Sequence, residues 1–245
     1  MAPQLPGEPP GRPHRSIPMT KKPVQPLDLD RLRQDIVFSD TLLGHPLTFH
    51  TTWGLFSPKA IDEGTRLLLD HLEVRPDERA IDLGCGYGPL GLAIAKSAPQ
   101  GRCLMVDKDF VAVDYANKNA ERNNIPNAHA ILSDGLRHVP RQTFTLAVTN
   151  LPAKTSKEHY YLFFHDIYEH LEAEGRLYVV VISGLRQFIA RAFEQVFGNH
   201  RKLKQGRQYT VAMAQKRPAQ DYRSDFGLPI DSSLAPYSRS SEDKR

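Results

Sequence analysis

Short apolar strands alternate with amphipathic helices along most of this chain, and this alternation restricts the fold more than any other feature. Two parallel strands joined through a helix form the repeating unit of sheets that carry helices on both faces. The pattern predicts strands at 79–83, 103–106, 128–132, 144–149 and 177–182, with helices between them and a further helix at 185–197. We therefore expect an α/β fold built on a doubly wound, mostly parallel sheet with helices on both faces.

Both ends of this pattern add elements of their own. Strand patterns at 200–204 and 208–214 flank Gln205-Gly206-Arg207, which predicts a C-terminal antiparallel hairpin and a sheet of seven strands. Before the first long helix, a short strand is expected at 47–51. Ser57 and Pro58 follow it, and they are typical of a helix N-cap and a first helical residue. We expect a helix to begin there.

The composition divides the chain into one domain and two tails. The first 26 residues contain eight prolines, and the segment from Arg217 onward is rich in Ser, Asp and Arg. Such segments cannot bury enough apolar surface to offset the entropy of ordering. We expect disordered tails at 1–29 and 217–245, and one domain at 30–216.

Several classes of protein are excluded by what the chain lacks. No apolar run approaches the roughly 18 residues of a membrane span, and no apolar segment near the start resembles a signal peptide. The two cysteines cannot form a disulfide framework, and the ten histidines show no metal-ligand spacing. We expect a cytoplasmic protein without a metal site. Its net charge of +4 permits a nucleic-acid partner without requiring one.

The distinctive polar residues follow the ends of the predicted strands. Asp82 begins a glycine-rich segment, Asp107 ends the next strand, Ser133-Asp134 end the third and Asn150 ends the fourth. The carboxyl ends of parallel strands meet at one edge of a sheet, where ligands of such folds bind. The sequence therefore predicts one ligand site at this edge.

The glycine-rich segment indicates a nucleoside-containing cofactor. Glycines at 84, 86 and 88 allow a tight turn and a close approach of backbone to ligand, and the next helix directs its N-terminus there. Asp107 comes 19 residues after Gly88, where a carboxylate can accept both hydroxyls of a ribose. A dinucleotide also fits this spacing, but its pyrophosphate would be repelled by Asp82. S-adenosylmethionine, which carries an ammonium group and no phosphate, is favoured over NAD or a glycine turn without a ligand.

These residues resemble a known family. Asp82-Leu83-Gly84-Cys85-Gly86-Tyr87-Gly88 looks like the first motif of class I S-adenosylmethionine-dependent methyltransferases. Gly54-Leu55-Phe56-Ser57 and Asp62-Glu63-Gly64-Thr65 resemble a segment of the "methyltransferase small" family, which includes ribosomal small-subunit RNA guanine methyltransferases and single-domain relatives. The likeness covers about residues 49–216.

The resemblance implies roles for the residues at the sheet edge. The glycines would line the methionine part of the cofactor, Asp82 would act on its ammonium, Asp107 would hold the ribose, and Phe56 and Ser57 would help to close the pocket. The expected cofactor-binding residues are Asp82, Gly84, Cys85, Gly86, Gly88, Asp107, Lys108, Ser133, Asp134 and Asn150.

Asn150-Leu151-Pro152-Ala153 is the segment expected to carry chemistry. Relatives that methylate amines have Asn-Pro-Pro and a large residue here, which holds the amine by its hydrogens in line with the methyl group. Asn150, Leu151 and Pro152 are the expected catalytic residues. Ala153 removes an aromatic platform for a flipped base; Tyr160 and Tyr161 could replace it, although they fit the apolar face of a helix better.

Three functions remain open at this point. The first is methylation of an exocyclic amine of an RNA base, by resemblance a guanine of ribosomal RNA. Basic residues at 200–207, together with Lys154 and Lys157, could contact its phosphates. The second is methylation of a small molecule or a protein. The third is a module that binds the cofactor but has lost the chemistry because the Asn150 motif is altered.

Overall fold

The computed structural model describes residues 34–139, 143–152 and 155–217. All of them lie in one compact unit, Gln34–Arg245. The expected tail at 1–29 and the expected domain boundary near residue 30 lie outside the described residues, as does all of the expected tail at 217–245 except Arg217.

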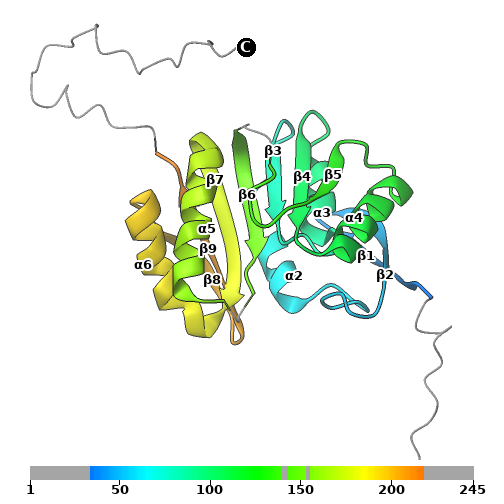
Figure 1. Ribbon diagram of the computed structural model, residues 1–245, viewed down its shortest axis with the longest axis horizontal. Coiled ribbons are helices and arrows are strands. Elements are labelled where there is room, and N and C mark those ends of the chain that lie inside the picture. Colours follow the sequence, from blue (N-terminus) through cyan, green and yellow to red (C-terminus); the bar gives the residue numbers. More distant parts are fainter. Residues whose placement is uncertain (1–33, 140–142, 153–154, 218–245) are drawn as a thin grey trace, which may run out of the picture. The chain divides into compact units, whose positions relative to one another are not determined.

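A seven-stranded sheet forms the centre of this unit, in the order β5-β4-β3-β6-β7-β9-β8 (Figure 1). The first five strands in this order are parallel, β9 runs antiparallel to β7, and β8 runs antiparallel to β9. The predicted fold class, with its C-terminal antiparallel hairpin, is confirmed. The strands are β3 (Arg79–Leu83), β4 (Arg102–Asp107), β5 (Ala128–Leu132), β6 (Phe144–Asn150), β7 (Leu171–Ile182), β8 (Arg201–Gln205) and β9 (Tyr209–Gln215).

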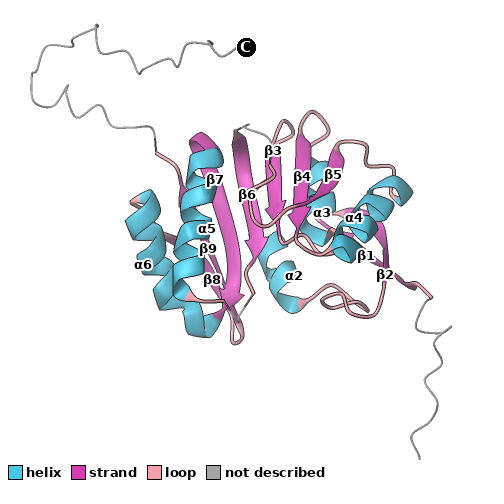
Figure 2. Cartoon of the chain, viewed as in Figure 1, coloured by secondary structure: helices cyan, strands magenta, loops and turns pink. Residues whose placement is uncertain are grey.

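Helices cover both faces of this sheet (Figure 2). One face carries α2, α3 and α4, and the other carries α5 and α6. The helices are α2 (Glu63–Leu69), α3 (Pro89–Ser97), α4 (Phe110–Arg122), α5 (Lys157–His170) and α6 (Arg186–Phe197), the last preceded by the short 3-10 helix η1 (Ser183–Leu185).

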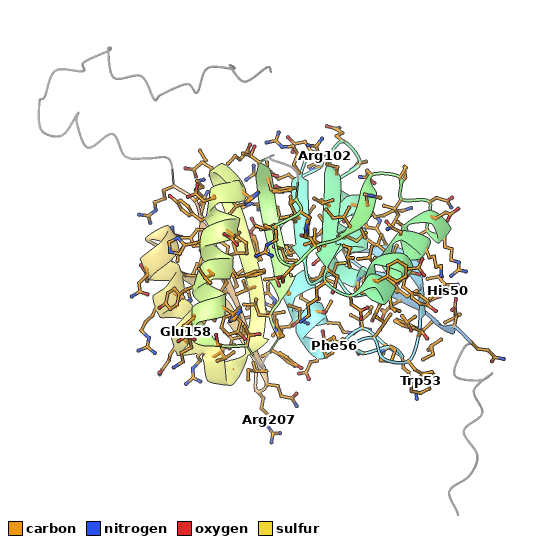
Figure 3. All side chains as sticks on the ribbon, viewed as in Figure 1. His50, Trp53, Phe56, Arg102, Glu158 and Arg207 are labelled. Atoms are coloured by element: carbon orange, nitrogen blue, oxygen red, sulfur yellow. The ribbon has the colours of Figure 1, made fainter. Side chains whose placement is uncertain are left out.

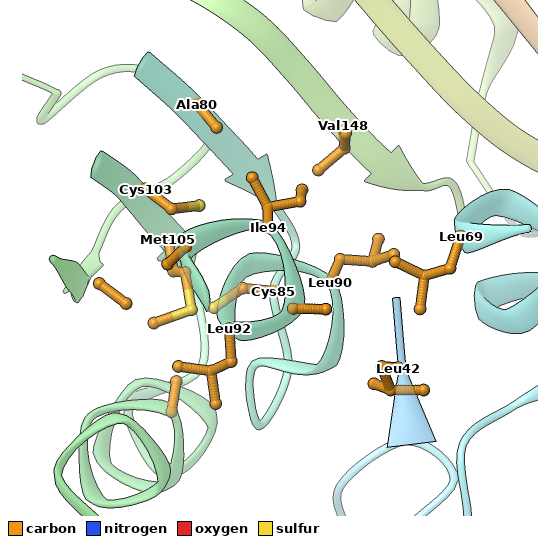
Figure 4. Packing of buried hydrophobic residues seen from close by; sticks show 14 of the residues in the cluster. Leu42, Leu69, Ala80, Cys85, Leu90, Leu92, Ile94, Cys103, Met105 and Val148 are labelled. Carbon is orange, nitrogen blue, oxygen red and sulfur yellow. The ribbon is translucent and has the colours of Figure 1, made fainter. Parts of the chain in front are cut away.

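Two apolar cores result from the alternation of side chains along the strands. Ala80 and Val148 face the core under α3, which Figure 4 shows together with Ile94 and Met105. Their neighbour Ile81 belongs to the core under α5 and α6. Successive side chains of a strand point to opposite faces, so a strand buried on both faces is apolar throughout.

A separate two-stranded hairpin, β1 (Ile36–Leu42) and β2 (His45–Thr51), packs against α4. The sequence predicted the strand at 47–51 but not its partner. Asn119 accepts a hydrogen bond from the His50 N–H (2.8 Å) and donates to the His50 carbonyl (2.9 Å), and Asn123 does the same for Thr48 (2.9 and 2.8 Å). Asn119 of α4 and Asn123, the C-cap of this helix, thus hold β2 as a neighbouring strand would.

The predicted helix start at Ser57 is wrong. Ser57 lies in a turn with a positive φ of 48°, and its hydroxyl donates to the Ala60 carbonyl (2.7 Å). α2 begins at Glu63 instead, because the carboxylate of Asp62 accepts the N–H groups of Gly64 (2.8 Å) and Thr65 (3.0 Å). A side-chain cap that satisfies two free N–H groups defines the start of a helix better than proline at its first position.

Candidate active site

A cavity of about 260 Å³ opens at the carboxyl ends of the parallel strands. It joins the two sets of residues that the sequence singled out separately. From the expected cofactor set it is lined by Gly84, Asp107, Lys108, Ser133 and Asp134, and from the expected catalytic set by Asn150, Leu151 and Pro152. The lining of the cavity does not include Asp82, Cys85, Gly86 or Gly88.

The glycine loop needs the conformational freedom of its glycines. Gly84, Gly86 and Gly88 all have positive φ angles, 71°, 55° and 96°. Side chains with a Cβ rarely adopt this region. The N–H groups of Gly84 and Cys85 donate to the Val106 carbonyl at 2.9 and 3.0 Å, which holds the loop against the end of β4.

Asp107 connects this loop to the cavity. Its Oδ2 accepts the Gly86 N–H at 2.9 Å, and its Oδ1 accepts the Asp109 N–H at 3.0 Å. Each carboxylate oxygen has a second acceptor position. The half-buried carboxylate can therefore accept two hydroxyl groups from a ligand in the cavity while it still holds the loop.

Asp82 lies beneath the loop. Its carboxylate is fully buried, with Oδ2 accepting the Gly91 N–H at 2.9 Å and Oδ1 without a hydrogen bond in the described part of the chain. Burial, together with a smaller effect of the nearby charge of Asp107, raises the pKa of Asp82 to about 7. Glycine is needed at position 91 for this close approach. A Cβ there would lie 2.4 Å from Cγ of Met105 and would push the helix away from Asp82.

The side chain of Cys85 belongs to the core rather than to the cavity (Figure 4). It is 5% exposed, and burial raises the pKa of its thiol well above the usual value. Burial therefore disfavours the reactive thiolate, and the side chain of Cys85 does not line the cavity.

Ser133 and Asp134 directly follow β5, and both line the cavity. The buried Ser133 hydroxyl donates to the Gly135 carbonyl (2.8 Å) and accepts the His138 N–H (3.1 Å), so it shapes the turn. Asp134 is exposed and lines the cavity.

Asn150, at the end of β6, is held by residues of α2. Its Nδ2 donates to Oδ2 of Asp62 at 2.7 Å and to Oγ1 of Thr65 at 3.1 Å. The next residue, Leu151, is buried and donates its N–H to the Val180 carbonyl at 3.0 Å. Asp62 and Thr65 were not among the expected site residues, although both lie in the segment that carried the family resemblance.

The aromatic residues of α5 combine core packing with a cavity wall. Tyr160 is buried against Phe164 and Phe188, as its position on the apolar face predicts, and its hydroxyl donates to the Pro152 carbonyl. Tyr160 and Phe163 also line the cavity. Phe163 was not expected at the site either, because its spacing marks only the apolar face of a helix.

Phe56 and Ser57 do not line the cavity, and their part in closing a cofactor pocket stays a prediction. Phe56 is 68% exposed and Trp53 is 47% exposed, with the ammonium of Lys59 at 4.7 Å from the Trp53 ring centroid. Figure 3 shows Trp53, Phe56 and Arg207 on the side of the molecule toward which β3 and β6 point, with Arg102 on the opposite side.

Within residues 34–139, 143–152 and 155–217, no group of three or more His, Cys, Asp or Glu side chains could hold a metal ion. No helix of the described chain is long and apolar enough to cross a membrane.

A family model described as the methyltransferase small domain matches residues 46–213. The uncharacterized protein YbxB of Bacillus subtilis is 38% identical over 146 residues, which are 59% of this chain and 73% of that protein. Ribosomal RNA small subunit methyltransferase C of Stutzerimonas stutzeri is 31% identical over 174 residues, 69% of this chain and 51% of that protein.

Among solved structures, the 16S rRNA N2 G1207 methyltransferase (RsmC) of T. Thermophilus, in complex with AdoMet and guanosine, superposes with a TM-score of 0.67 at 29% identity. The match covers 74% of this chain and 50% of that one. This chain therefore spans about half the length of the ribosomal RNA methyltransferases that it matches.

Proposed function

Because the chain belongs to the methyltransferase small-domain family and is a methyltransferase that uses S-adenosylmethionine, we propose that it methylates an exocyclic amine of an RNA base. A guanine of ribosomal RNA is the first candidate, which would place the protein in the cytoplasm. The observation that carries the proposal is that Asn150 lines the same cavity as Gly84 and Asp107.

The lining residues fit the cofactor by the chemistry of their donors and acceptors. Asp107 would accept the ribose hydroxyls, Asp134 would accept the adenine amine, and the backbone at Gly84 allows a close approach of the methionine part. The buried charge of Asp82 would favour an ammonium group close to the loop. The bound cofactor supplies a methyl group on a sulfonium, whose leaving group is a neutral thioether.

The chain's own part in the reaction is to orient the acceptor. The lone pair of an exocyclic amine is delocalised into its ring. When the Asn150 carboxamide oxygen and the Leu151 carbonyl accept the two amine hydrogens, the lone pair localises and points at the methyl group. Alignment of this kind supplies most of the rate enhancement for a transfer with a good leaving group.

The surface on the side of the molecule toward which the parallel strands point supports RNA as the acceptor. Trp53 and Phe56 present exposed rings on which bases can stack, and Lys59, Lys157 and Arg207 are exposed cations that can contact phosphates. Two of the relatives described above are ribosomal RNA methyltransferases by name, and one of them binds guanosine.

Transfer of labelled methyl from S-adenosylmethionine to total RNA, protein and metabolite fractions of a strain lacking the gene tests the acceptor. We expect label in RNA, at a guanine after nuclease mapping. Label confined to protein or metabolites would replace RNA by that acceptor. Bound cofactor with no transfer to any fraction would make the chain a binding module.

Asn150→Ala tests the residue that is proposed to contact the acceptor. The rate of transfer should fall on the order of 10²-fold, the scale for one transition-state hydrogen bond, with cofactor affinity changed little. Asn199→Ala is the matched control. Asn199 donates hydrogen bonds to the carbonyls of Phe197 and Gln215, at the end of β9 that lies away from the cavity. Equal loss in both variants would mean that Asn150 is structural.

A further inference from the structure

We propose that Asp62, the N-cap of α2, and Thr65, in its first turn, are positioning residues that determine which end of the Asn150 carboxamide faces the acceptor amine. This inference rests on the proposed function, because it takes Asn150 as the group that contacts the acceptor. Asp62 and Thr65 lie 88 and 85 residues before Asn150 in the chain and outside the cavity lining.

Three side chains form a closed set of hydrogen bonds. Oδ2 of Asp62 accepts from Nδ2 of Asn150 (2.7 Å) and from Oγ1 of Thr65 (2.6 Å), and Oγ1 of Thr65 lies 3.1 Å from the same Nδ2. A carboxylate can only accept, and the threonine proton is already donated to Asp62. Both neighbours can therefore only accept from Asn150, which places its NH₂ group toward α2.

The carboxamide oxygen must then lie at the other end, away from Asp62. The two ends of an amide have nearly the same shape, so packing alone would allow either orientation of the Asn150 carboxamide. Only one of the two orientations suits the reaction. An oxygen accepts the hydrogens of the acceptor amine and localises its lone pair. An NH₂ group in its place would set donor against donor and leave the lone pair in the ring.

The orienting carboxylate is itself held rigidly. Asp62 caps α2 by accepting the N–H groups of Gly64 and Thr65 at 2.8 and 3.0 Å. α2 contacts β7 and β9, and a Cβ on Gly64 would lie 3.0 Å from the ring of Tyr209. The start of the helix is thus fixed on the sheet, and a catalytic group gains most from supports that do not move.

Asp62→Asn is the primary test, because asparagine caps helices as well as aspartate does. The amide at position 62 no longer offers two acceptor oxygens, so the NH₂ group of Asn150 loses its carboxylate partner. We expect kcat to fall at least tenfold, with cofactor Kd and melting temperature nearly unchanged. Thr65→Val should lower kcat and Thr65→Ser should restore it. Asp114→Asn, the same change at a carboxylate of α4 that pairs with Lys118 outside the cavity lining, should leave kcat unchanged.

An exchange of the two groups gives a sharper test. Asn150→Asp alone sets two carboxylates at hydrogen-bond distance and should be nearly inactive. In Asp62→Asn/Asn150→Asp, the amide at 62 donates to the carboxylate at 150, whose other oxygen faces the acceptor. This double variant should be at least tenfold more active than either single variant. A merely structural role for Asp62 predicts no such rescue. A double variant no more active than the single variants would overturn the proposal.

The side-chain ¹H–¹⁵N signals of Asn150, assigned by their loss in Asn150→Asp, give a readout that needs no activity. A hydrogen bond to a carboxylate should separate the two proton shifts, and Asp62→Asn should bring them together. Identical shifts in wild type and Asp62→Asn would overturn the positioning role even if RNA is methylated. The expected shift change without methyl transfer to any acceptor would instead refute the proposed function.

Discussion

At the level of single residues, Asp82 combines a structural contact with an unfavourable environment. One of its oxygens holds the first turn of α3 through the Gly91 N–H, and the other has no partner within the described residues. A buried carboxylate with one free oxygen favours its protonated form. Its pKa of about 7 therefore connects the stability of the cofactor-free protein to pH.

The sign of this dependence follows from the direction of the shift. The pKa is raised from 3.8 to about 7, so between these values the folded protein keeps a proton that the unfolded chain has lost. The free energy of unfolding should therefore fall as pH rises from about 4 to about 7, by on the order of 4 kcal/mol at most.

Asp82→Asn removes this titration and keeps an acceptor for Gly91. Urea unfolding of the cofactor-free variant between pH 4 and pH 8 should give a flatter stability curve than the wild type, with the gain in relative stability at the upper end. Asp134→Asn, at an exposed carboxylate, is the control. Parallel curves for wild type and Asp82→Asn would show that Asp82 is ionised throughout.

At the level of secondary-structure elements, the basic residues of the β8–β9 hairpin do not all lie at the same end of the sheet. The sequence places Arg201, Lys202, Lys204 and Arg207 on one basic segment, and all four are exposed. Gln205 pairs with Thr210 close to the end of β7 at Ile182, whereas Arg201 pairs with Met213, toward the other end. The turn is therefore at the cavity side of the sheet, where Figure 3 shows Arg207.

If RNA is the acceptor, this arrangement predicts that Lys204 and Arg207 contact its phosphates. Lys204→Ser/Arg207→Ser should weaken binding to all RNAs about equally and reduce the log–log salt slope by about one for each phosphate that is no longer neutralised. Filter binding at several salt concentrations measures the slope. Arg201→Ser, on the same strand but toward the other end, should change it less. A salt slope near zero for the wild type would exclude a surface that binds RNA phosphates.

At the level of the whole domain, a buried ion pair connects the two halves of the sheet. Arg176 at the start of the regular part of β7 contacts Glu78, just before β3, at 2.5 Å, and both side chains are buried. Arg176 also donates to the Glu73 carbonyl (3.1 Å), and Glu78 accepts the Arg75 N–H (3.1 Å). The pair thus joins β7 to the segment between α2 and β3.

Removing one partner should leave the other charge buried without compensation. Glu78→Ala should lower the free energy of unfolding by about 3–5 kcal/mol, and Glu78→Leu/Arg176→Met should recover most of it. Arg79→Ala breaks the more exposed pair with Glu172 and should cost under about 1 kcal/mol. Chemical denaturation measures all three. A double variant as unstable as Glu78→Ala would mean that the ion pair itself stabilises the fold.

Elements whose signals are local could be predicted from the amino-acid sequence alone. The strand Ala128–Leu132 and the helix between it and the preceding strand lie where the pattern places them, because apolar periodicity acts within a few residues. The order of strands and helices then led to the fold class, and the glycine loop and Asp107 indicated the cofactor edge. The roles of the individual site residues remain predictions.

Features that depend on distant partners became visible only in the folded chain. The β1–β2 hairpin is held by Asn119 and Asn123, about 70 residues away. The sequence of the hairpin itself gives no indication of these partners. Phe56 is exposed and Cys85 is buried because of what packs around each of them. The orientation of Asn150 depends on Asp62, 88 residues earlier. A hydrogen bond between side chains that far apart in sequence exists only after the sheet and α2 have packed together.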